Sequence, residues 1–192
     1  MKISAAVLTA IIMGLVISVS AQVAKPNYEL PAKFIKPTKW VEANKRTGTD
    51  VDQYGCIYPD SMDVQKALKI IDTEKDFLKL CQVKTWCLKN YQAIFPELIK
   101  RLTDTKEIGL NVFMDLHVLG REDYSWNNPM STGSKAGIFV NEDVFTIAGR
   151  ASWILNKITG EDFAEVRVTK KEEELQGFQK QWSKYIEDLK KE

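Results

Sequence analysis

The stretch that decides the fold is DVFTIAGRASWILNKITG, residues 143–160. Its apolar side chains recur at spacings of three and four, which places them on one face of a helix. Aromatic side chains widen that face, so the pattern predicts a largely buried helix that begins at Asp143. Gly160 follows the last apolar residue and is expected to end the helix, because glycine adopts the left-handed conformation at little cost.

Helical spacing also appears on both sides of this stretch. Asp60 and Ser61 are expected to cap a first helix, Thr73 caps a second, and Pro96 suits the first turn of a third. A last amphipathic helix is predicted from residue 171 to residue 189. Consecutive helices with short breaks form an antiparallel stack, so we expect a mainly α domain. That domain covers residues 60–192.

Residues 108–140 interrupt the helical pattern. Over residues 110–118 every second side chain, beginning with Leu110, is aliphatic or Met. This period of two predicts a strand. Residues 137–140 are expected to supply its partner, which makes a small β-hairpin-like insertion. Between them, residues 120–136 are rich in Gly, Ser, Asn and charge. Long loops of this kind in compact domains are often functional.

Two stretches carry a resemblance to a known family. The stretch FPELIKRLTD, residues 95–104, is similar to the first helix of a bacterial HEAT-like repeat, and residues 148–163 resemble a second helix that ends in Thr-Gly and Phe. A later Trp-containing helix fits residues 178–182, so the resemblance extends over residues 143–186. It implies a scaffold or binding surface and carries over no catalytic residue. The chain departs from the family because no second copy of the motif follows at a fixed period.

The N-terminus has the pattern of an export signal. Residues 1–21 combine Lys2, an apolar run and a small-residue cleavage site, which predicts a signal peptide cut between Ala21 and Gln22. The alternative is an uncleaved anchor, but polar chain follows the apolar run at once. We therefore expect an extracytoplasmic protein, periplasmic or secreted, with no membrane span after cleavage. Residues 22–59 hold four of the six prolines and predict an extended arm that packs through aromatic side chains.

Charge and cysteine content limit the function classes. Removing Lys2 leaves 27 − 1 = 26 basic against 26 acidic side chains, so the near-neutral chain predicts no nucleic-acid partner. A single histidine and no close cysteine pair predict no metal site, and no cofactor is expected. In an oxidising compartment Cys56 can pair with Cys81 or with Cys87. Cys81 and Cys87 are six apart in a predicted helix and would not pair with each other.

All but one of the candidate functional residues lie in the insertion; the exception, Arg150, lies in the helix predicted to begin at Asp143. His117 with Asp115 or Asp123 has the composition of a general base beside carboxylates, although exposed polar positions on a half-buried strand would look the same. Tyr124 and Trp126 can form a recognition patch, or pin the loop to the body. Two arginines, Arg121 and Arg150, are candidate binding residues; the alternative for Arg150 is a structural ion pair, with Asp143 or with a residue of the insertion.

These observations favour a binding or scaffold module over an enzyme. The common nucleotide, metalloprotease and hydrolase motifs do not occur in the chain. The leading prediction is an exported HEAT-like protein that binds another macromolecule, a protein or an envelope component, through residues 108–140. The alternatives are a small extracytoplasmic enzyme that uses His117 with its acidic neighbours, and a purely structural envelope component. The sequence leaves the oligomeric state open.

Overall fold

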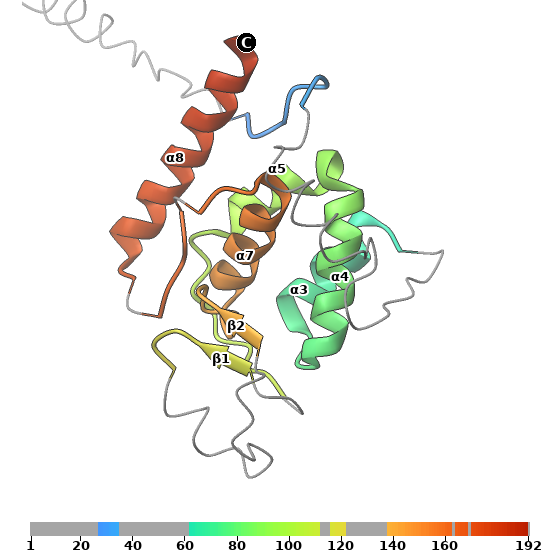
Figure 1. Cartoon of the computed structure of the whole chain (residues 1–192), viewed down its shortest axis with the longest axis vertical. Helices are drawn as coiled ribbons and strands as arrows, with labels where there is room; N and C mark the ends of the chain where they lie inside the picture. Colours follow the sequence, from blue (N-terminus) through green and yellow to red (C-terminus); the bar gives the residue numbers. More distant parts are fainter. Residues whose placement is uncertain are drawn as a thin grey trace, which may run out of the picture.

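A computed structural model describes six ranges of the chain and shows a mainly helical protein (Figure 1). The described residues are 27–34, 62–111, 116–121, 138–162, 164–168 and 170–191. Within them the elements are α3 (Val64–Thr73), α4 (Phe77–Lys89), α5 (Tyr91–Arg101), β1 (Leu116–Val118), β2 (Ile138–Val140), α7 (Ile147–Thr159) and α8 (Glu172–Lys191). In this part of the chain, no helix is both long and apolar enough to cross a membrane.

Helix α7 lies at the centre of the body, and it is largely buried, as predicted from the sequence. It contacts α3, α4 and α5, and all of its residues except Lys157 are buried. Gly160 ends the helix with φ 74°, as predicted. The predicted start is wrong, because Thr146 is the N-cap and its hydroxyl oxygen accepts from Gly149 N–H at 3.1 Å. Asp143 lies in the preceding turn, where its carbonyl accepts from Thr146 N–H at 2.9 Å.

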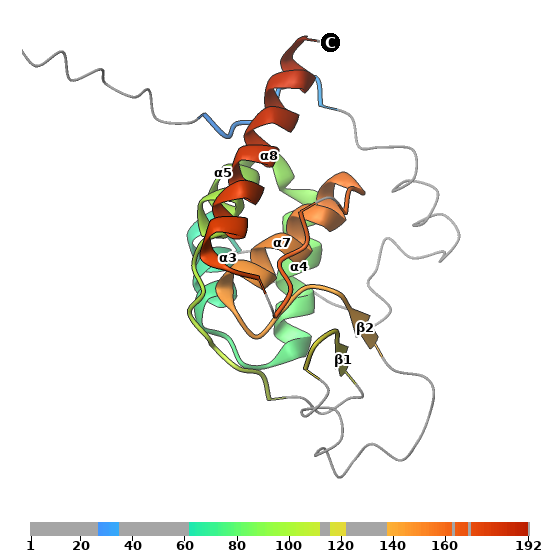
Figure 2. The same ribbon diagram turned by 90° about the vertical axis from the view of Figure 1, so that its left-hand side faces the viewer.

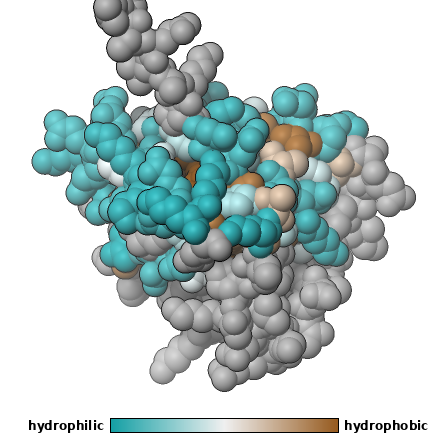
Figure 3. All heavy atoms as spheres, turned by 90° about the horizontal axis from the view of Figure 1, so that it is seen from above, coloured by the Kyte–Doolittle hydropathy of each residue, from teal (hydrophilic) through white to brown (hydrophobic). Residues whose placement is uncertain are grey.

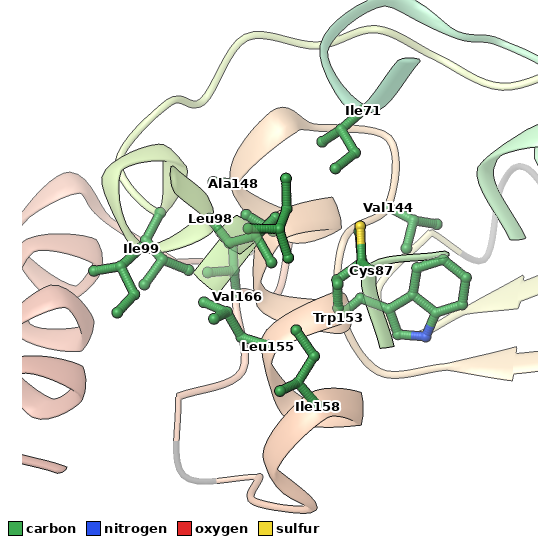
Figure 4. Packing of buried hydrophobic residues seen from close by; sticks show 14 of the residues in the cluster. Ile71, Cys87, Leu98, Ile99, Val144, Ala148, Trp153, Leu155, Ile158 and Val166 are labelled. Atoms are coloured by element: carbon green, nitrogen blue, oxygen red, sulfur yellow. The ribbon is translucent and has the colours of Figure 1, made fainter. Parts of the chain in front are cut away.

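The hydrophobic core surrounds α7 on several sides. Figure 4 shows side chains from α3, α4, α5 and α7 converging in this space. Phe77 at the start of α4 stacks on Trp153 of α7, with ring centroids 5.9 Å apart. Burial of this many apolar groups is the main favourable term in folding. The labelled residues are Ile71, Cys87, Leu98, Ile99, Val144, Ala148, Trp153, Leu155, Ile158 and Val166.

The ends of α4 and α5 differ from the predicted ones. Thr73 is the last residue of α3, and Asp76 caps α4 by accepting from Leu78 N–H at 2.9 Å. Asp60 and Ser61 lie outside the described residues, and Asp63 caps α3. Pro96 is inside α5 rather than in its first turn. Buried side chains on both sides of Pro96 pack into the core, so tertiary burial outweighs the lost backbone hydrogen bond.

Helix α8 packs along α5 at one side of the body (Figures 1 and 2). Trp182 of α8 meets Phe95 of α5 edge-on, with ring centroids 5.6 Å apart. Residues 27–34 are the described part of the predicted arm and lie at the end of the body where α8 ends. Phe34 is buried there against Tyr91 of α5, with ring centroids 5.6 Å apart. An aromatic side chain therefore attaches this segment to the body.

The two strands pair in parallel, so the predicted hairpin-like arrangement is wrong. Leu116 pairs with Ile138 and Val118 pairs with Val140. A hairpin joins antiparallel strands by a tight turn, whereas a parallel pair needs a connection long enough to cross back. The long stretch 119–137 meets that requirement. Both views place β1 and β2 at the end of the body opposite the C-terminus of α8 (Figures 1 and 2).

Candidate functional site

Arg121, just after β1, fastens the start of the long connection to the body. Its Nε and Nη2 atoms donate to the two carboxylate oxygens of Asp143 at 3.1 and 3.0 Å. Its Nη1 atom donates to Glu107 at 3.0 Å, and the guanidinium lies 4.8 Å from the centre of the Phe145 ring. A bidentate arginine–carboxylate pair fixes direction as well as distance. The predicted binding residue Arg121 therefore acts as a clamp.

The guanidinium of Arg121 keeps its positive charge although it is partly buried. Burial lowers the pKa of Arg121, but hydrogen bonds and charge from Asp143 and Glu107 outweigh burial and raise that pKa above its usual value. The Asp143 side chain is 6% exposed and that of Glu107 is 60% exposed. Surface ion pairs contribute little, so most of the stabilisation comes from the Asp143 half of the clamp.

Backbone contacts fix the same turn. Leu119 N–H donates to the Val140 carbonyl at 3.1 Å, and Arg121 N–H donates to the Val118 carbonyl at 3.0 Å. Gly120 has φ 90°, and a Cβ atom there would lie 3.3 Å from Val168 Cβ. These contacts anchor the chain as far as Arg121, and pairing of the strands anchors it again from Ile138, the first residue of β2. Residues 122–137 join two anchored ends, and we call residues 116–121 and 138–143 the root of the insertion.

Arg150 is enclosed in the body and contacts backbone oxygens. It is fully buried, and its guanidinium donates to the carbonyls of Val144 at 2.8 Å, Ile71 at 2.8 Å and Gly109 at 3.0 Å. Burial lowers its pKa to about 10, against the opposing effect of nearby acidic charges. The expected pairing with Asp143 is wrong, because that carboxylate accepts from Arg121. Arg150 therefore joins three segments and is placed away from any surface ligand.

The remaining predicted site residues are only partly described. His117 is the middle residue of β1 and is half-buried between the buried Leu116 and Val118, which agrees with the predicted alternation. Its proposed partners Asp115 and Asp123, and the aromatic residues Tyr124 and Trp126, lie outside the described residues. Across the described ranges, no three His, Cys, Asp or Glu side chains gather in a way that could hold a metal ion.

The two described cysteines lie in α4 and are buried. Burial raises the pKa of the Cys87 thiol to about 12, so little thiolate forms near neutral pH. Cys56, the predicted disulfide partner of Cys81 or Cys87, lies outside the described residues. No disulfide is formed within the ranges that the structure describes. The pairing stays a prediction.

A buried polar seam, formed by Glu142, Ser152 and Asn156, was not predicted from the sequence. Asn156 Nδ2 donates to Glu142 Oε1 at 2.8 Å, and Ser152 Oγ donates to the Ala164 carbonyl at 2.7 Å. Burial raises the pKa of Glu142, more than the hydrogen bond from Asn156 lowers it. Ser152 and Asn156 are four residues apart on α7, a helix whose other side chains are mainly apolar. That spacing was the signal that could have revealed the seam.

Comparison with known proteins adds no relative. No protein family, no curated protein and no solved structure matches the chain.

Proposed function

We propose that this protein is an exported scaffold that binds another macromolecule, a protein or an envelope component, through the insertion at residues 108–140. The observation that carries the proposal is the double anchorage of the root. Arg121 is held by Asp143 and Glu107, and β1 is held by β2. A rigid scaffold that presents a connecting segment is a common arrangement for binding sites.

The composition of the insertion suits recognition. Residues 122–137 include Tyr124, Trp126 and several Asn, Ser and Gly residues. Tyrosine and tryptophan provide large contact areas at low entropic cost, and small polar residues provide adaptable hydrogen bonds. Anchored ends lower the entropy that such a segment loses on binding. Leu119, at the edge of the root, is 51% exposed and extends the apolar contact area.

The surface of the helical body has a different character. Among the described residues, Leu78 and Leu119 are the exposed large hydrophobic side chains. On the face seen from above in Figure 3, the described residues are mainly hydrophilic, with small hydrophobic areas. This contrast supports a body that holds the insertion in place and an insertion that makes the contact.

Export and the HEAT-like stack are parts of the same proposal. The signal peptide at residues 1–21, cut between Ala21 and Gln22, would place the mature chain outside the cytoplasm. The close packing of α5 on α7 supports an arrangement like the two helices of one HEAT-like repeat. In that arrangement neighbouring helices run antiparallel, and the insertion separates the two helices of the repeat along the chain.

Partner capture tests the proposed function. Residues 122–136 are replaced by a Gly/Ser linker of equal length, which leaves Arg121 and β2 in place. We expect the wild-type chain to retain partners from an envelope extract that the replaced chain and a Tyr124→Ala/Trp126→Ala variant lose. Leu78→Ala, which changes an exposed side chain of α4, is the matched control and should capture as the wild type does. Identical partners for all four chains would contradict the proposal.

Intact mass tests export and the cysteine pairing. The protein is purified from an exporting host and alkylated under denaturing, non-reducing conditions. We expect a chain that begins at Gln22 and carries one alkylated cysteine, because Cys56 pairs with Cys81 or Cys87. In Cys56→Ser both remaining cysteines should be alkylated. A wild-type chain that begins at Met1 with three alkylated cysteines would contradict both predictions.

A further inference from the structure

Two neighbouring residues at the root, Asn141 and Glu142, each form a hydrogen bond with a residue farther along the chain. The two pairs differ in environment. Asn156 Nδ2 donates to Glu142 Oε1 at 2.8 Å, and Asn141 Nδ2 donates to Glu165 Oε1 at 3.0 Å. Glu142 is 6% exposed and Asn156 is 7% exposed. Glu165 has a further cation partner in Arg167. The pair of Glu142 and Asn156 is therefore buried, whereas the charge of Glu165 in the other pair is balanced by Arg167.

The buried pair leaves one atom unsatisfied. Asn156 Oδ1 is fully buried and has no hydrogen-bond partner among the residues that the structure describes, although its Nδ2 atom donates to Glu142 Oε1. An ionised carboxylate has only acceptor oxygens and cannot satisfy another acceptor. A protonated carboxyl has one O–H donor, and it forms two hydrogen bonds with a planar amide. Buried acceptors without a donor are rare in folded proteins.

We propose that Glu142 is a protonated carboxyl whose O–H donates to Asn156 Oδ1, and that this pair is a proton-dependent clasp on the root of the insertion. In the closed pair the Asn156 amide donates to one oxygen of Glu142 and accepts from the other. When the pH rises, the proton passes to solvent, the second hydrogen bond is lost and a charge is left in the interior. The proposal concerns the fold and does not depend on what the insertion binds.

The surrounding charges agree with a neutral Glu142. Burial raises its pKa, Lys157 of α7 lowers it and the carboxylate of Glu165 raises it. The next residue, Asp143, is already paired with Arg121, so that guanidinium is engaged by another carboxylate. The positive charge of Lys157 is on the one exposed residue of α7, where water screens it. Burial is therefore the dominant effect on Glu142.

The clasp lies where it can act on the insertion. Glu142 is two residues after β2 ends at Val140 and one residue before Asp143, which Arg121 clamps. Folding raises the pKa of Glu142. The clasp therefore contributes its full stabilisation of the fold at pH values below the pKa that this carboxyl has in the unfolded chain. That stability is lost as the pH rises through the folded pKa. We expect the root to be held more firmly in acidic surroundings than in neutral ones.

Urea unfolding from pH 4 to pH 8 tests the clasp with Glu142→Gln and the matched control Glu165→Gln. A glutamine at 142 can form both hydrogen bonds with Asn156 at every pH. We expect Glu142→Gln to match the wild type at acid pH and to become more stable above it, by about tenfold in the folding constant per unit of pKa shift. Burial raises the pKa of Glu165, but hydrogen bonds from Asn141 and Arg167 outweigh it and lower that pKa, so Glu165→Gln should lose stability at neutral pH.

A measurement on the wild-type chain completes the test whether or not the variants fold. The carbon-13 shift of the Glu142 carboxyl should keep its protonated value at pH values where exposed glutamates are already ionised. An ionised Glu142 at those pH values would overturn the clasp, because a water molecule would then be needed to satisfy Asn156. A Glu142→Gln variant that is less stable than the wild type at neutral pH would also overturn it.

Discussion

Arginine is used differently in the helical body and at the root of the insertion. In the body, Arg150 is fully buried and donates to three backbone carbonyls from three segments. At the root, Arg121 is partly exposed and donates to the carboxylates of Asp143 and Glu107. The buried carbonyls of the body depend on Arg150 for a donor, whereas Glu107, one of the two carboxylates at the root, is 60% exposed and can turn to water. The body should therefore tolerate substitution less than the root.

The largest expected effect is in the body, at Arg150. Arg150→Leu leaves the carbonyls of Val144, Ile71 and Gly109 without their donor in the interior. Each such oxygen costs about 1–3 kcal/mol, so we expect a loss of about 4 kcal/mol in the free energy of unfolding. Arg150→Lys should recover only part of it, because an ammonium lacks the fork of donors. Urea unfolding of both variants measures the difference, and a loss near zero in Arg150→Leu would contradict this account of the body.

A second large effect is expected one residue earlier, at Gly149. A Cβ atom there would lie 1.8 Å from the Asp143 carbonyl oxygen, so Gly149→Ala must displace the turn that carries the clamp. We expect a loss of about 3 kcal/mol in thermal or urea unfolding. The matched control is Gly177→Ala in α8, where no atom of the described residues lies within 4 Å of the added atom. That variant should gain about 0.5–1 kcal/mol, since alanine favours helix over glycine.

The root should show a smaller effect on stability and a larger one on binding. Arg121→Gln leaves Asp143, whose side chain is 6% exposed, without its cation, and we expect a loss of about 1–2 kcal/mol in unfolding free energy. Arg167→Gln, which removes a more exposed cation from Glu165, is the control and should cost less than about 0.5 kcal/mol. In the capture experiment Arg121→Gln should retain less partner than this control. Equal capture would show that the clamp does not serve binding.

Residues 143–160 show which features the sequence could reveal. The spacing of apolar side chains predicted the central helix, and Gly160 predicted its end, because both signals are local. The cap positions were less certain: Thr73 and Asp76 are both capping types within four residues, and Asp76 is the one whose carboxylate reaches the N–H groups of α4. Local signals thus determined the elements better than their ends.

Features that depend on distant partners could not be predicted. Arg150 and Ile71 are 79 positions apart, and no local pattern assigns that arginine to a carbonyl rather than to Asp143. The direction of the strands was missed for the same reason, since alternation predicts a strand but not which way its partner runs. No local pattern distinguishes Glu142, next to Asp143, from an exposed acid. Its burial beneath the root follows from the packing of α7 and not from its neighbours in the chain.

Amide hydrogen exchange on the protein, free and bound to a captured partner, tests whether residues 108–140 make the contact. We expect binding to slow exchange in peptides covering residues 108–140 and to leave the peptides of α8 unchanged. In the free protein, amides of α7 should exchange most slowly, since every residue of that helix except Lys157 is buried. A binding footprint on α8 or on residues 27–34, with residues 108–140 unaffected, would contradict the claim that the body presents the insertion.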